Sequence, residues 1–77
     1  MSVKGWFDYD VTVVGSDRTT GNAVSELRKV SFTIFDLIRS GYNPDEKANI
    51  AREGALELVK RAHPTWDCLT VQSCIEV

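Results

Sequence analysis

The strongest constraint on the fold is the alternation of apolar and polar side chains over residues 6–14. The apolar positions are Phe7, Tyr9, Val11 and Val13, and the polar positions between them are Asp8, Asp10 and Thr12. A period of two, built from aromatic and β-branched residues, is typical of a strand with one buried face. The sequence therefore predicts a strand over 6–14. A hairpin loop over 15–22 should follow, because turn-forming residues gather there.

A second alternating segment closes the chain at residues 66–77. One face is predicted to carry Leu69, Val71, Ile75 and Val77, and the other Trp66, Cys68, Thr70, Gln72 and Cys74. This pattern predicts a terminal strand. In an extended strand two residues six positions apart are about 20 Å apart, which is too far for a disulfide. We therefore expect both cysteines to be reduced thiols that pack as small apolar side chains, in a cytosolic protein.

The pattern between the strands changes to a helical period at residues 43–62. Asn43 is predicted to be the N-cap, Pro44 the first helical residue and Glu46 the partner in a capping box, and Pro64 should end the helix. The predicted apolar stripe consists of Ala48, Ala51, Ala55, Leu58, Val59 and Ala62. Because alanine predominates in this stripe, the helix can lie close to a sheet.

Residues 23–38 fit two periods. Val30, Phe32 and Ile34 alternate with hydroxyl residues, which favours a strand. The apolar positions from 23 to 38 also fit helical spacing, with Gly41 placed as a C-cap. We prefer the strand because the centre of the segment is rich in β-branched and aromatic residues, and because a helix would leave Phe32 on its polar side.

These elements predict an α+β fold in a single domain over residues 1–77. An antiparallel sheet is expected to carry one helix on one face, in the order strand, strand, helix, strand. The alternative order is strand, helix, helix, strand. In the preferred order the second face of the sheet carries Trp6, Trp66 or both, and is either solvated or covered by a partner.

The sequence contains no recognisable catalytic or metal-binding set. His63, the one histidine, lies at the predicted helix end, where it favours the negative pole of the helix dipole. With Cys68 and Cys74 it fits no zinc-ligand spacing, and the glycines fit no phosphate-binding motif. We therefore expect a protein that is not an enzyme and that has no catalytic residues, metal, cofactor or small-molecule substrate.

The candidate functional residues are therefore those of a binding surface. Tryptophan is frequent at binding hot spots, and the acidic face of the first strand could meet a basic partner. The predicted protein-binding residues are Trp6, Asp8, Asp10 and Trp66, and the partner is another protein or a second copy of the chain.

The alternative function is regulation through nucleic-acid binding. It would use Arg28, Lys29, Lys60 and Arg61. It is the less favoured reading because the net charge is −2, whereas a dedicated nucleic-acid binder normally carries a basic excess.

The size, acidic balance and element order of the whole chain resemble those of small accessory proteins of bacteriophages, including anti-CRISPR and other host-inhibitor proteins. No residue motif carries this resemblance, so it assigns no site residues. It implies stoichiometric binding to a larger assembly, which the protein would inhibit or modulate by occupancy or charge mimicry. The location implied is the host cytoplasm. The N-terminal residues show no secretory signal, and no apolar run reaches the length of a membrane span, so we expect a cytoplasmic protein that does not enter membranes.

Overall fold

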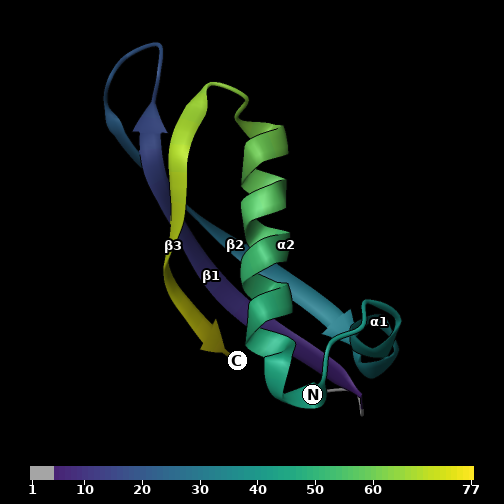
Figure 1. The fold of residues 1–77 in the computed structure, drawn as a ribbon. Helices are drawn as coiled ribbons and strands as arrows, with labels where there is room; N and C mark the ends of the chain where they lie inside the picture. The colour runs from purple at the N-terminus through teal and green to yellow at the C-terminus, as the bar shows by residue number, and fades with distance from the viewer. Residues whose placement is uncertain (1–4) are drawn as a thin grey trace.

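A computed structural model describes residues 5–77 (Figure 1). The elements are β1 (Trp6–Asp17), β2 (Ala23–Thr33), α1 (Ile34–Arg39), a 3-10 turn η1 (Pro44–Glu46), α2 (Lys47–Ala62) and β3 (Trp66–Glu76). The strands form an antiparallel sheet in the order β2-β1-β3, and α2 lies along one face of it (Figure 1). The predicted α+β class and the antiparallel sheet with a helix on one face are confirmed. The prediction that the N-terminus has no secretory signal concerns mainly residues 1–4, which lie outside the described residues.

The central strand β1 supplies the middle of the core. Tyr9, Val11 and Val13 are buried beneath α2, on the face that the alternation predicted. Phe32 of β2 stacks on Tyr9, with ring centroids 5.8 Å apart. Full burial of a valine side chain contributes about 1.5–3 kcal/mol. The strand that pairs on both sides is therefore also the one that contributes most to the core.

Residues 23–38, the ambiguous segment, divide at Thr33. Residues up to Thr33 form β2, as preferred, and α1 begins directly after it. Thr33 and Asp36 form a reciprocal capping box, because the Thr33 hydroxyl accepts from the Asp36 N–H and the Asp36 carboxylate accepts from the Thr33 N–H. Ser40 is the C-cap of this helix and Gly41, at φ +80°, follows it, next to the place that the less favoured helical interpretation gave Gly41. The observed order is therefore strand, strand, helix, helix, strand. It contains the second strand of the preferred order and, after that strand, a short helix that the preferred order lacked.

The predicted start of the long helix is wrong by one turn. Asn43 makes no capping hydrogen bond through its side chain, and Pro44 opens a 3-10 turn instead of the α-helix. Regular α2 begins at Lys47. The Asn-Pro-Asp-Glu sequence of residues 43–46 therefore forms an entry turn to α2 and not its first helical turn.

Small side chains let α2 lie close to the sheet. Ala51, Ala55 and Val59 are completely buried, and Gly54 lies so close to β2 that a Cβ atom there would be 3.4 Å from the Val30 side chain. The predicted alanine stripe is thus confirmed at its centre. Leu58 and Ala62, which the prediction also placed in the stripe, are exposed, Leu58 by 42%, so the stripe is wrong at these two positions.

Two register shifts in the β1–β3 ladder change the predicted faces of β3. The shift between Thr12 and Val13 reverses the alternation, so that Cys74 packs on the core while Ile75 and Val77 are exposed. The assignment of these three residues was therefore wrong, whereas Leu69 and Val71 do pack on the core as predicted.

The second shift lies at the end of β1, which is longer than predicted. The strand continues through Gly15 to Asp17, so the predicted loop is too long at its start. Cys68 bulges out opposite Gly15 with φ +55°, a left-handed conformation that is unfavourable for a side chain with Cβ. A Cβ atom at Gly15 would lie 2.7 Å from the Asp67 carbonyl oxygen. The glycine is therefore needed for strand approach. None of the helices in residues 5–77 is long and apolar enough to span a bilayer.

We predict opposite effects for two glycine substitutions. Gly15→Ala should lower the free energy of unfolding by about 1–3 kcal/mol, because the new methyl group meets backbone that cannot move aside. Gly54→Ala is the matched control and should raise it by up to about 1 kcal/mol, because alanine favours the helix and the contact with Val30 is ordinary. Urea unfolding followed by circular dichroism measures both, and equal effects would contradict this account of the bulge.

Candidate functional site

The face of the sheet opposite α2 is the main candidate surface, because no described element covers it. Side chains paired across antiparallel strands point to the same side, so the register places Lys29, Asp10 and Ile75 in one row of this open face. The next row contains Leu27, Thr12 and Ser73. We call this surface, with Trp6 and Asp8 further along β1, the open face.

Large apolar side chains are exposed on the open face. Trp6 is 47% exposed, and Leu27 and Ile75 are each 61% exposed. They come from three different strands, so only strand pairing brings them onto one surface. Sequence reasoning identified Trp6 but missed the other two. Leu27 fitted a helical stripe, and the bulge in β3 reverses the expected face of Ile75.

Asp8 and Asp10 lie on the open face, as predicted. The Asp8 carboxylate accepts a hydrogen bond of 2.6 Å from the hydroxyl of Ser31, its cross-strand neighbour. One carboxylate oxygen of Asp10 is buried and has no hydrogen-bond partner among the described residues. An unsatisfied carboxylate oxygen is energetically costly, and the basic residue directly across from Asp10 on the neighbouring strand is Lys29.

Trp66 does not join these residues. The bulges of β3 turn it to the helix side, where it packs against the core and stacks on His63 with ring centroids 3.7 Å apart. The expectation that the uncovered face carries Trp6, Trp66 or both is therefore met by Trp6 alone.

His63 has a different set of contacts from the one expected. Its backbone N–H caps α2 by donating to the Val59 carbonyl, and its Nε2 lies 2.9 Å from Glu26 of β2. A carboxylate only accepts, so Nε2 carries the shared proton. The second oxygen of Glu26 accepts from Arg28 at 2.7 Å. These bonds hold the pKa of Glu26 below its usual value, the bond from His63 having the largest effect.

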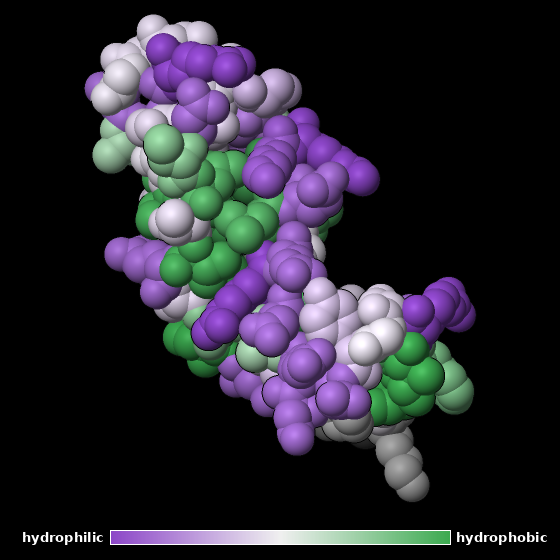
Figure 2. All heavy atoms as spheres, in the orientation of Figure 1, coloured by the Kyte–Doolittle hydropathy of each residue, from purple (hydrophilic) through white to green (hydrophobic). Residues whose placement is uncertain are grey.

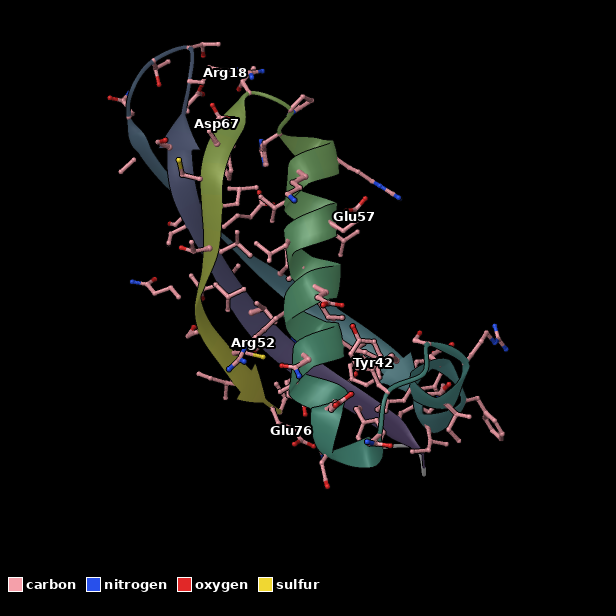
Figure 3. The ribbon with its side chains drawn as sticks, in the orientation of Figure 1. Arg18, Tyr42, Arg52, Glu57, Asp67 and Glu76 are labelled. Atoms are coloured by element: carbon pink, nitrogen blue, oxygen red, sulfur yellow. The ribbon has the colours of Figure 1, made fainter. Side chains whose placement is uncertain are left out.

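A matching contact fixes the other end of α2. Lys47 lies 3.1 Å from Glu76, the last residue of β3, and its ammonium group is 4.7 Å from the centre of the Phe7 ring. Tyr9 donates to the other oxygen of Glu76, and burial is the main cause that raises the pKa of this tyrosine to about 12. Glu76 is labelled in Figure 3, beside the start of α2.

The four basic residues of the nucleic-acid hypothesis do not form one patch. Arg28 lies on the helix side, bound to Glu26, whereas Lys29 lies on the open face opposite Asp10. Lys60 and Arg61 lie in the last turn of α2, where Arg61 pairs with Glu57. Neighbouring residues of a strand point to opposite sides, which is why Arg28 and Lys29 separate.

The cysteines and the hairpin end show no catalytic grouping. Cys68 and Cys74 are free thiols, and residues 5–77 hold no group of three or more histidine, cysteine or carboxylate side chains that could bind a metal ion. Cys68 lines an open hollow together with Val14, Ser25 and Thr70. Near this end, Arg18 of the hairpin loop approaches Asp67 at 4.0 Å (Figure 3).

A second apolar surface lies on α1. Phe35 is 71% and Ile38 63% exposed, and Figure 2 shows hydrophobic side chains gathered at this end of the molecule, whereas the outer side of α2 is hydrophilic. Sequence reasoning did not identify this patch, because the short helix was not separated from β2. Tyr42 follows α1 and bonds back to Glu53 of α2 (Figure 3).

Comparisons of the chain with models of protein families, with curated proteins and with solved structures found no match.

We predict that Glu26→Gln destabilises the protein in a pH-dependent way. The folded pKa of Glu26 is lowered, so its contribution is present above the unfolded value near 4.5 and is lost as pH falls through the folded value. At pH 7 the variant should lose about 0.5–1 kcal/mol, and the difference from the wild type should shrink as the pH falls below the unfolded value of 4.5. Urea unfolding across this range tests the prediction. Glu57→Gln, at an exposed pair, is the control and should have little effect. A difference for Glu26→Gln that is the same at every pH would refute it.

Proposed function

We propose that this chain is a non-enzymatic module that binds a partner protein through the open face of its sheet. The observation that carries the proposal is the exposure of Trp6, Leu27 and Ile75 on one uncovered sheet face. Exposed apolar side chains that share a surface are typical of protein-binding sites. Tryptophan is also among the residues that contribute most to binding energy.

The polar residues between these side chains define the chemistry of the partner. Asp8 and Asp10 follow Trp6 along β1, and Asp10 retains a carboxylate oxygen without a donor. A lysine or arginine of the partner would complement the acidic stripe of Asp8 and Asp10. The partner surface is therefore an apolar patch with a basic group beside it.

Small side chains make the rest of this face accessible. Ser25, Thr12 and Ser73 lie around the apolar residues, so a partner could approach the sheet closely. This fits one-to-one occupancy of a larger assembly, the mode of action implied by the resemblance to phage accessory and host-inhibitor proteins. The scattered positions of the basic residues give the nucleic-acid hypothesis no comparable support.

We predict that Trp6→Ala weakens partner binding while leaving the fold intact. Loss of a tryptophan at a hot spot lowers affinity by about 30-fold or more, equivalent to roughly 2 kcal/mol. The measurement is affinity capture from host lysate with quantitative mass spectrometry, followed by calorimetric titration of the recovered partner. Leu58→Ala is the matched control, because Leu58 is 42% exposed on α2, on the other side of the sheet.

The paired substitution Asp8→Lys with Asp10→Lys tests the charge requirement. It should abolish capture of the same partner, because two basic groups would then face the basic surface. A partner retained by both open-face variants but lost with Leu58→Ala would place the binding site on the helix side and refute the proposal. A monomeric protein that captures no stoichiometric partner would do so as well.

A further inference from the structure

The structure assigns a self-association surface to the outer edge of β2. We infer that two copies pair antiparallel along this edge about a twofold axis at Leu27, forming one continuous six-stranded sheet. This inference concerns the strand edge and does not depend on the partner proposed for the open face.

The two edges of the sheet differ in regularity. β2 pairs with β1 over Ala23–Thr33 without a register shift. β3, the other edge, carries two register shifts and a left-handed residue at Cys68. Bulges and kinks obstruct the addition of another strand, whereas a long regular edge is a template for it. The edge suited to pairing is therefore β2.

Symmetry restricts the possible registers. A twofold axis normal to the sheet places one residue of β2 opposite its own copy, and this residue fixes all other pairs. An axis at Glu26, Arg28 or Lys29 would place identical charges in direct opposition, which is destabilising. An axis at Ser25 would place Glu26 opposite Val24 of the second copy and leave the charge without a partner.

An axis at Leu27 gives a complementary set of pairs. Glu26 lies opposite Arg28 of the second copy, and Arg28 lies opposite Glu26 of that copy. The sequence contains this symmetry as Val-Ser-Glu-Leu-Arg-Lys-Val over residues 24–30, in which Val24 would meet Val30 and Ser25 would meet Lys29. Leu27, which is 61% exposed, would meet its own copy at the axis. Opposite charges and apolar side chains in direct cross-strand pairs stabilise an antiparallel ladder.

The consequence for the molecule is a doubled binding surface. With the axis normal to the sheet, both copies of α2 lie on one side of the six-stranded sheet and both open faces lie on the other. In such a symmetric dimer the β2 edges of both copies pair with each other. The two outer edges of the six-stranded sheet are then the bulged β3 strands, which do not accept a further strand. It therefore predicts a dimer and no larger assembly.

Disulfide trapping tests the register. In a Cys68→Ser, Cys74→Ala background, Leu27→Cys should form a covalent dimer under mild oxidation, because directly opposed residues lie about 4.5–5.5 Å apart at Cα, within disulfide range. The control is Ile75→Cys in the same background, a residue with the same 61% exposure on the same face but at the other edge. Efficient trapping of Leu27→Cys alone supports the inference. Equal trapping of both variants, or of neither, overturns it.

Charge exchange tests the same register without a covalent bond. Arg28→Glu should weaken the dimer about tenfold or more, as measured by sedimentation equilibrium, because it places Glu26 opposite a second acid. The double exchange Glu26→Arg with Arg28→Glu restores both opposite pairs and should recover most of the dimer. Because it also removes the contact between Glu26 and His63, circular dichroism must first show that the variant is folded. Dimerisation that does not change in either variant would overturn the register, whereas Trp6→Ala should leave the dimer intact even if it abolishes partner binding.

Discussion

The close contact between α2 and the central strand β1 is the constraint on which the rest of this structure depends. Ala51, Ala55 and Val59 are completely buried against a strand whose own inward residues are Tyr9, Val11 and Val13. A helix with larger side chains would stand further from so narrow a sheet and leave voids. Because one helix covers one face, the second face has no covering within the described chain, and the candidate binding surface follows from that asymmetry.

Polar contacts hold both ends of α2 against the sheet. At its start Lys47 meets Glu76, and at its end His63 meets Glu26. These contacts connect the helix to both outer strands. The histidine and the inward charges of β2 therefore belong to the scaffold, whereas Trp6, Asp8 and Asp10 lie on the open face.

The bulges of β3 have two consequences that bear on function. They turn Trp66 and Cys74 toward the helix and Ile75 toward the open face, so the apolar residues available for binding differ from those that simple alternation selects. They also disrupt one edge of the sheet and leave β2 as the regular edge. A local irregularity thus decides both which side chains a partner would meet and which edge a second copy would use.

The sequence by itself determined the elements whose causes are local. The alternation over 6–14 identified the core strand and its buried face, and the alanine spacing identified α2, because each signal acts within a few residues. The tertiary structure alone decided the exact start of α2, the faces of β3 and the grouping of Trp6, Leu27 and Ile75. Bulges and strand register arise from packing between segments distant in the sequence, and no local pattern records them.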